Sequence, residues 1–397
     1  QQAILYIDNA LLMRWFGFGF NAFEQITPHD KLIKEGLGEV KVGPVELTSY
    51  RDGRDCKIRA CWSRRATLYF NGKFSDSCVC AAGFGAVTES CAAVKESHGC
   101  KDALVSESHL TLAFPDRLES WDLQKEDKTP SWNVFFFLFS DSRLNLPLVP
   151  GGYIATKAPL YRPLSPHLKA KSVAVSAEHA VLLSATGAVY TWGLGSHGQL
   201  GHGVLTSEEE PRAVEALWGM PVIRVAAGGW HSVCISDGGD LYVWGWNETG
   251  QLGLPSRSLR RTLPQQSSPK AGASSAEAPH AGGKQEEVFI SIQAFPALLD
   301  VSPSCEIMAV SCGSRHTAAV TTTGDLYTWG WVTIPGDYSQ LGHPSLASTD
   351  EPQRVEFFRE QQMRVVDVVC GAWNTFVAVV KEEITNVSKA SHTKQLM

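Results

Sequence analysis

The chain has 397 residues, enough for one large repeat domain or two ordinary ones, and 44% of them are hydrophobic. Its formal net charge of −6 argues against a broadly basic nucleic-acid-binding surface, although a local basic patch or a basic partner remains compatible with it. The longest dense apolar run, residues 134 to 139, is far too short to span a bilayer. We therefore expect a folded chain without a membrane span.

The beginning of the chain and its cysteines bear on cellular compartment. The first residues lack a basic segment ahead of an apolar core, so we expect no signal peptide. Without export, the ten cysteines are expected to be reduced. Six of them fall between residues 56 and 100, but no CxxC pair accompanies them, so buried thiols are favoured over a metal site.

A repeat of roughly 50 residues dominates the sequence. Three histidines each lie 13 residues before a tryptophan, and the tripeptide QLG follows each pair. The pairs are His179 and Trp192, His231 and Trp244, and His316 and Trp329. Repetition at this period predicts a repeat architecture in which each copy is one structural unit.

The two ends of the chain each carry half of this repeat. Residues 11 to 23 match its second half, a tryptophan followed by glycines alternating with aromatics. Residues 368 to 380 match its first half, with Asn374 at the position of the histidine. The halves predict a ring closed by pairing the first strand with the last, which would remove exposed sheet edges.

Between these ends, residues 11 to 170 are degenerate. Residues 56 to 75 look like a weathered copy, with a hairpin signal at Asn71-Gly72 and Arg64 or Arg65 in place of the histidine. In another candidate copy, His109 precedes Trp121 by 12 residues. Residues 122 to 170 show no spacing typical of the repeat, so a further unit is either hidden there or missing.

We call residues 157 to 166 the strap, because its spaced prolines predict an extended segment. Such a segment could present Lys157, Ala158, Pro159, Tyr161 and Arg162 to a protein partner. The alternative is a strap that simply packs along the body.

The clearest copies lie at residues 173 to 253 and 310 to 380. In LYVWG, Tyr242 and Trp244 share one face of a strand while Leu241 and Val243 share the other. Apolar residues on both faces predict a strand sandwiched between neighbouring sheets. Residues 254 to 288, rich in Ser, Pro, Ala and Gly, predict a disordered insert, and residues 381 to 397 a polar tail.

The combination xCGxxHT…LYxWGxxxxGQLGH closely resembles the repeat of the regulator of chromosome condensation superfamily. The resemblance implies an all-β fold, a six- or seven-bladed β-propeller of four-stranded antiparallel blades, formed by a single domain from residue 11 to residue 380. The opening WFGFGF, the strap and FPALLD at 295 to 300 resemble a small member of the superfamily that carries this domain alone.

That resemblance implies a non-enzymatic nuclear adaptor, with the cytoplasm as the alternative location. The implied partner is a JmjC-domain, 2-oxoglutarate-dependent oxygenase, in histone methylation and chromosome segregation, with histones or chromatin contacted indirectly. The strap is the implied contact, but this chain has Lys157 where the family presents an arginine, so modification of an arginine cannot occur there.

The motif residues themselves favour a structural role over a chemical one. Equivalent histidines in different blades would lie far apart around a ring, so we expect each to hydrogen-bond a neighbouring backbone group rather than bind metal. The tryptophans are expected in the blade core. No GxSxG, HExxH or P-loop pattern appears, and we expect no enzymatic activity, no cofactor and no sequence-specific binding of nucleic acid.

Two other functions stay open. The founding member of the superfamily is a guanine-nucleotide exchange factor for a small GTPase, and some relatives act as adaptors in the ubiquitin pathway. The degenerate N-terminal half and the insert between copies speak against nucleotide exchange, which would use a rim loop.

Overall fold

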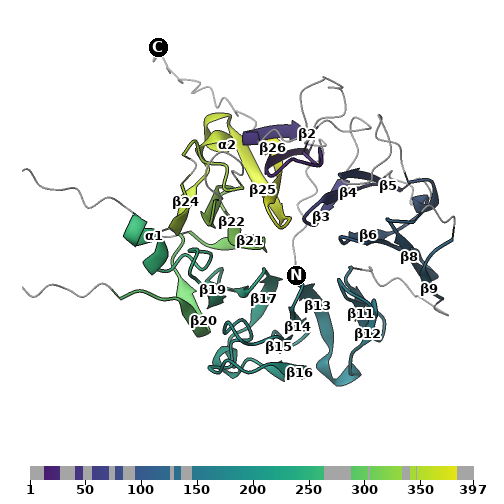
Figure 1. The fold of residues 1–397 in the computed structure, drawn as a ribbon, viewed down its shortest axis with the longest axis horizontal. Helices are drawn as coiled ribbons and strands as arrows, with labels where there is room; N and C mark the ends of the chain where they lie inside the picture. The colour runs from purple at the N-terminus through teal and green to yellow at the C-terminus, as the bar shows by residue number, and fades with distance from the viewer. Residues whose placement is uncertain are drawn as a thin grey trace, which may run out of the picture.

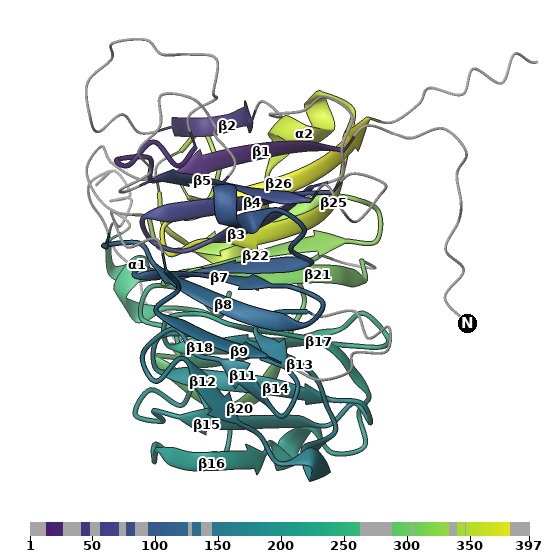
Figure 2. The ribbon, with the colours of Figure 1, turned by 90° about the vertical axis from the view of Figure 1, so that its right-hand side faces the viewer.

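The computed structural model describes residues 13–26, 41–47, 56–70, 77–83, 94–125, 129–135, 145–262, 288–302, 305–332, 340–345 and 347–381. These residues form seven separate antiparallel sheets arranged as blades around a central axis (Figure 1). Seen from the side, the blades form a thick disc (Figure 2). The predicted β-propeller is confirmed, and of the two expected blade numbers the structure has seven.

The first three blades come from the degenerate part of the sequence. Blade 1 contains β3 (Cys56–Ala60), β4 (Arg64–Tyr69) and β5 (Cys78–Gly83). Blade 2 contains β6 (Asp102–Val105), β7 (His109–Ala113), β8 (Arg117–Asp122) and β9 (Trp132–Phe135), preceded by the 3-10 turn Lys95–Ser97. Blade 3 contains β10 (Leu148–Val149), β11 (Gly152–Ile154) and β12 (Tyr161–Pro163), followed by the 3-10 turn Pro166–Leu168.

The next three blades contain the clear repeats. Blade 4 consists of β13 (Ala170–Val175), β14 (His179–Ser184), β15 (Val189–Gly193) and β16 (Glu208–Ala213). Blade 5 consists of β17 (Val222–Ala227), β18 (His231–Ser236), β19 (Leu241–Trp246) and β20 (Ile292–Leu299), with the 3-10 turn Glu215–Leu217 before it. Blade 6 consists of β21 (Ile307–Cys312), β22 (His316–Thr321), β23 (Leu326–Gly330) and β24 (Thr349–Arg354).

Blade 7 closes the ring. The C-terminal strands β25 (Met363–Cys370) and β26 (Asn374–Lys381) follow α2 (Glu356–Glu360), and they pair with the N-terminal β1 (Arg14–Gly19) and β2 (Lys41–Leu47). β1 runs antiparallel to β26, with Gly17 opposite Phe376. Phe16 and Val377 both lie in the hydrophobic cluster between blades 6 and 7. The predicted closure by two half-repeats is therefore confirmed.

The unit missing from the sequence pattern is blade 3, within residues 122 to 170. Its described strands are only two or three residues long. Blades 1 and 3 each have three strands among the described residues, whereas the other five blades have the predicted four. Short strands leave too few alternating positions to produce the periodicity by which the other copies are recognised.

Burial of both faces explains the strand composition. All six residues of β14, β18 and β22 are buried, because neighbouring blades cover both faces of these second strands. The outer strand β16 is largely exposed and reads EEEPRA. Charges and a proline on an outer edge discourage pairing with other chains. Blades 4 and 6 therefore change from apolar to charged toward the outer edge, whereas the outer strand of blade 5, β20, reads IQAFPALL.

The glycine of QLG is required because no side chain fits at its position. Gly201 has φ +77°, and a Cβ built on it would lie 2.9 Å from Nε1 of Trp244 in the next blade. Gly253 stands in the same relation to Trp329, at 3.1 Å. Both the backbone conformation and the close approach of an indole exclude a side chain at these positions. The conspicuous glycines thus allow the blades to stack closely.

The predicted insert at residues 254 to 288 begins in an ordered way. The predicted disorder is wrong for its first residues, which form α1 (Arg257–Thr262) at the rim near β20 and β24 (Figure 1). The Arg260 guanidinium pairs with Asp350 at 3.1 Å and with Glu351 at 3.1 Å, both on β24. Residues 263–287 and the tail 382–397 lie outside the described residues.

Membrane-spanning helices and metal-binding clusters are both absent from the described residues. No helix there is long and apolar enough to cross a membrane. No group of three or more His, Cys, Asp or Glu side chains in the same part of the chain could hold a metal ion.

Candidate interaction site

The three motif histidines join neighbouring blades through hydroxyl groups. His179 Nε2 lies 2.7 Å from Ser232 Oγ, His231 Nε2 lies 2.9 Å from Thr317 Oγ1, and His316 Nε2 lies 3.0 Å from Thr375 Oγ1. The histidine belongs to one blade and the hydroxyl to the next. The expectation of a backbone partner is wrong: the partner is the side chain of the residue that follows the histidine, or Asn374 in blade 7, in the next copy.

The direction of these bonds follows from the hydroxyls. Ser232 donates to the carbonyl oxygen of Gln199 at 2.8 Å, and Thr317 donates to that of Gln251 at 2.7 Å. A hydroxyl that has used its single proton can only accept from the histidine, so Nε2 carries the proton. Each junction is therefore a relay from histidine to hydroxyl to the QLG carbonyl.

Burial keeps these imidazoles neutral. It lowers the pKa of His179 to about 4 and the pKa of His231 and of His316 to about 3. Nδ1 of His231 and of His316 has no hydrogen-bond partner among the described residues, so a second proton would be buried there without an acceptor. A proton-transfer group for catalysis at neutral pH needs a pKa nearer 7, so these side chains suit a structural role.

The motif tryptophans complete the same junctions. Trp244 Nε1 donates to the Gln199 carbonyl at 2.9 Å, and Trp329 Nε1 donates to that of Gln251 at 3.0 Å. Both indoles are fully buried, as expected for blade core. Trp192, on the side facing blade 3, donates instead to the hydroxyl of Tyr153 at 3.1 Å. A tyrosine hydroxyl thus replaces the glutamine carbonyl as the acceptor at the junction between blades 3 and 4.

Two other blades have a different residue at the histidine position. Asn374 donates through Nδ2 to the carbonyl of Phe20 at 3.4 Å, a bond within blade 7. Arg64 is opposite Gly83 as His179 is opposite Gly193, which places Arg64 rather than Arg65 at the histidine position. The Arg64 guanidinium reaches the backbone carbonyl of Glu107 in blade 2. The amide and the guanidinium each make a polar contact, but neither builds the relay.

The strap occupies the loop between β11 and β12 and the strand that follows. Lys157, Ala158 and Pro159 are exposed at the turn, and Arg162 is exposed on β12. The loop is held at its base by a hydrogen bond from Ala155 N to the Leu160 carbonyl, at 2.7 Å. The strap thus has an extended strand, as predicted, and an exposed turn ahead of it.

Tyr161 behaves differently from its neighbours. Its ring stacks on Trp132 of blade 2 with centroids 6.3 Å apart, and it packs against the cluster containing Leu146 and Ile154. Its hydroxyl lies close to Gly151. Tyr161 therefore holds β12 to the body, as the alternative interpretation of the strap expected, whereas the turn and Arg162 are exposed.

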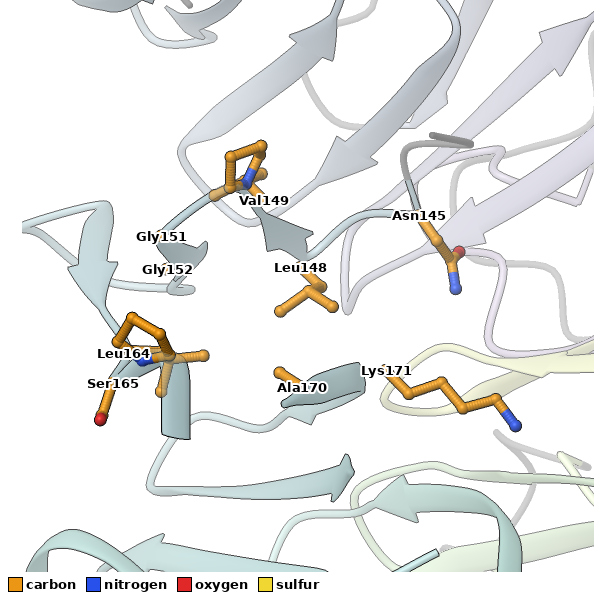
Figure 3. Close-up of a pocket in the computed structure, with 11 residues that line it drawn as sticks. Asn145, Leu148, Val149, Gly151, Gly152, Leu164, Ser165, Ala170 and Lys171 are labelled. Carbon is orange, nitrogen blue, oxygen red and sulfur yellow. The ribbon is translucent and has the colours of Figure 1, made fainter. Parts of the chain in front are cut away.

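A pocket of about 330 Å³ lies at the other end of β12 (Figure 3). The side chains of Leu148, Leu164 and Ala170 surround it, and the backbone of Gly151 and Gly152 contributes to its wall. The exposed turn of the strap precedes β12 and Leu164 follows it, so turn and pocket lie at opposite ends of this strand. The pocket could not be predicted from the sequence, because nearly all its residues come from the stretch without repeat spacing.

The strap lies beside the loops that precede the second strands of the regular blades. Thr156 Oγ1 donates to the Ser176 carbonyl at 3.3 Å, in the turn between β13 and β14. Glu178 in the same turn accepts a hydrogen bond from Trp230 Nε1 at 2.7 Å. Trp230 is partly exposed and differs from the buried motif tryptophans, a distinction that the repeat pattern alone does not make.

Comparisons with known proteins agree with this architecture. The model for the regulator of chromosome condensation (RCC1) repeat matches residues 186–235, 238–277 and 323–378, and a second RCC1 repeat model matches 170–199, 222–251 and 308–331. The structure of Prp20p from Saccharomyces cerevisiae has a TM-score of 0.67 at 17% identity, over 94% of this chain and 92% of that one.

The curated relatives extend the likeness beyond the recognisable repeats. RCC1 domain-containing protein 1 of Homo sapiens is 41% identical over 394 residues, which cover 93% of this chain and 97% of the relative. The protein of the same name from Mus musculus is 39% identical over 401 residues, with the same coverage. Identity at this level over nearly the whole of both chains, together with the seven-bladed ring and its repeat motifs, shows that this chain belongs to the RCC1 repeat family.

Proposed function

We propose that the chain is a non-catalytic, nuclear interaction scaffold whose strap recruits a JmjC-domain, 2-oxoglutarate-dependent oxygenase in histone methylation control and chromosome segregation. The partner is the one implied by the family resemblance, and histones or chromatin are proposed as indirect partners. The observation that carries the proposal is the exposed strap turn, Lys157 to Pro159, on an otherwise closed propeller.

The strap is suited to docking because it is both exposed and held in place. The bond from Ala155 to Leu160 and the bond from Thr156 to Ser176 fix the base of the turn. A loop already held in its binding conformation loses less conformational entropy on association. Lys157 and Arg162 place two positive charges on this surface, which suits a partner with an acidic docking surface.

A scaffold role also fits what the histidines do. His179, His231 and His316 are used in the bonds between blades, so they are not free to take part in proton transfer. Lys157 cannot undergo an arginine modification, and the proposal is therefore restricted to docking of the oxygenase.

The test is a binding measurement between the purified chain and a JmjC-domain oxygenase. The variant Lys157→Glu/Arg162→Glu reverses two exposed charges on the strap, and we expect affinity to fall about tenfold or more. The matched control, Arg257→Glu/Arg359→Glu, reverses two exposed arginines on other blades and should retain binding. Equal loss in both variants, or no loss in the first, would remove the strap from the mechanism.

Tyr161→Ala is unsuitable for this test, because Tyr161 packs on Trp132 and its removal would disturb blade 3 itself. A nucleotide-release assay with the nuclear transport GTPase addresses the rival function. We expect release at the background rate. Release well above background would replace the scaffold with an exchange factor.

A further inference from the structure

One face of blades 5, 6 and 7 carries an aromatic cluster with an arginine at its centre. We call it the tryptophan face, and it consists of Trp230, Trp246, Arg315, Trp331 and Trp373. All five side chains are partly exposed. Trp230, Arg315 and Trp373 each immediately precede the first residue of a second strand, and Trp246 and Trp331 follow the glycine of Trp-Gly. The repeat therefore brings equivalent positions from three blades to one surface.

Arg315 lies among three indoles. Its guanidinium carbon is 4.7 Å from the ring centroid of Trp331, 5.3 Å from that of Trp246 and 5.8 Å from that of Trp230. Trp230 and Trp246 contact each other edge to face, at 5.0 Å and 81°. Indole faces attract a guanidinium electrostatically and fix the orientation of its plane.

The backbone beneath this cluster is held by hydrogen bonds. Trp246 N donates to the carbonyl of Trp230 at 2.9 Å, and Trp331 N donates to that of Arg315 at 2.9 Å. Across the blades, Ser314 N donates to the Ala372 carbonyl at 2.9 Å, next to Trp373. The cluster is therefore built on paired backbone, which favours a site that is formed before any ligand arrives.

The hydrogen-bonding capacity of Arg315 is unused within the described part of the chain. No described residue accepts a hydrogen bond from its guanidinium, and none forms an ion pair with it. Burial lowers the pKa of this guanidinium, but arginine stays charged at neutral pH. A partly buried guanidinium with five donors, three indole contacts and no acceptor among the described residues can still bind a planar anionic acceptor.

We propose that the tryptophan face binds an acidic peptide segment of a partner protein, with a carboxylate of that segment pairing with Arg315. The indole edges around the arginine would contact an apolar residue next to the carboxylate. A cationic ligand, such as a methylated lysine, is disfavoured because the chain's own arginine already occupies the aromatic faces. Carboxylate and guanidinium match in geometry, and aromatic walls that limit water access strengthen their bond.

This site is distinct from the strap and does not depend on the oxygenase being the partner. Glu178 connects the two regions: its turn accepts a hydrogen bond from Thr156, the residue just before the strap, and its carboxylate accepts one from Trp230. A partner large enough to cover several blades could contact both. Binding at Arg315 can nevertheless be measured alone.

The test begins with selection from a random peptide library on the whole propeller, followed by fluorescence anisotropy with the enriched peptide. We expect selected sequences to carry Asp or Glu beside an aromatic or aliphatic residue. Arg315→Gln should weaken binding of the enriched peptide about tenfold or more, and replacing the acidic residue of the peptide by its amide should weaken binding to the wild-type chain similarly.

The matched control is Arg257→Gln, an exposed arginine on α1, which should bind the peptide as the wild-type chain does. Failure to enrich acidic peptides, or an equal loss in both arginine variants, would overturn the proposal. So would sedimentation showing that the wild-type chain is a dimer and that Arg315→Gln is a monomer, because the face would then serve self-association. Failure of the strap test leaves these outcomes unaffected.

Discussion

Blades 4 to 7 and blades 1 to 3 form the same ring by different means. At the junctions between blades 4, 5, 6 and 7, a histidine, a hydroxyl and a glutamine carbonyl recur with nearly the same geometry. Between blades 1 and 2 the polar contacts include ion pairs instead, with Lys57 and Arg59 both pairing with the buried Asp102 beside a shared hydrophobic cluster. Blades 4 to 7 therefore repeat one hydrogen-bond arrangement at their junctions, whereas blades 1 to 3 use different contacts at each junction.

The difference shows which interactions a propeller requires. Asp102 also accepts a hydrogen bond from Leu146 N at 2.8 Å, so it links blades 1 and 2 to the segment leading into blade 3. A buried carboxylate with several partners can replace a relay, because what matters is that buried polar groups are satisfied. The motif is therefore one sufficient way to stack blades, and its loss from blades 1 to 3 does not abolish the ring.

The largest expected effect is a loss of stability at low pH, caused by the three buried histidines of blades 4, 5 and 6. Because burial lowers the pKa of His179, His231 and His316 from 6.5 to between about 3 and 4, folding favours their neutral form. This stability is complete above pH 6.5 and is lost as the pH falls toward the folded-state values. At pH 5 the three together should lower the free energy of unfolding by about 6 kcal/mol. Urea unfolding followed by tryptophan fluorescence between pH 7.5 and 5 measures it. A free energy of unfolding unchanged over that range would contradict burial of neutral histidines.

The next effect tests the space around a relay. In Gly313→Ala the new Cβ would lie 2.0 Å from Cε1 of His316, so the imidazole must move away from Thr375. We expect a loss of about 3 kcal/mol in the free energy of unfolding. Gly43→Ala, whose Cβ would meet no atom within 4 Å, is the control. Equal stability of the two variants would show that the relay tolerates displacement.

A smaller effect compares one buried hydroxyl from each half of the ring. Thr317→Val removes both bonds of a relay and leaves His231 Nε2 unpaired, and we expect a cost of about 2 kcal/mol. Thr111→Val in blade 2 removes one bond, to Ser120 within the same blade, and should cost about 1 kcal/mol. Thermal unfolding of both variants gives the comparison. The reverse order would mean that the relays contribute less than local pairs.

The smallest expected effects distinguish the packed residue of the strap from an exposed one. Tyr161→Ala removes the ring that stacks on Trp132, and we expect it to lower the free energy of unfolding by about 2 kcal/mol. Arg162→Ala, one residue further on an exposed position, should stay within about 0.5 kcal/mol of the wild-type chain. Chemical unfolding of the two variants tests this division. Similar losses would show that the whole strap is part of the body.

Much of the fold could be predicted because the residues that define the repeat have specific steric roles. The 13-residue spacing of His231 and Trp244 identifies a hairpin, and the two half-repeats identify the closing blade. Blade 3 could not be counted, because its strands are too short to carry a period. The histidine's bond to the next blade was also beyond reach, since its partner Thr317 lies 86 residues away in sequence.

The candidate site divides in a similar way. The prolines of the strap predict extension, but they do not separate Tyr161, which is packed, from Arg162, which is exposed. Exposure depends on whether Trp132 of the neighbouring blade lies beneath a side chain, and a contact between blades has no local signature. Trp230 and Trp244 likewise belong to one copy, yet one is at the surface and the other is buried.

The sequence by itself determined the unit and its closure. A blade is defined by glycines at positions where a Cβ would clash and by apolar residues on both faces of a strand. Both features can be recognised before any neighbouring blade is known. Only the tertiary structure decided that there are seven blades, that a histidine of one blade bonds a hydroxyl of the next, and that Arg315 lies among tryptophans from two blades. The physical reason is that these are contacts between units, set by how the ring stacks and not by the order of residues within one repeat.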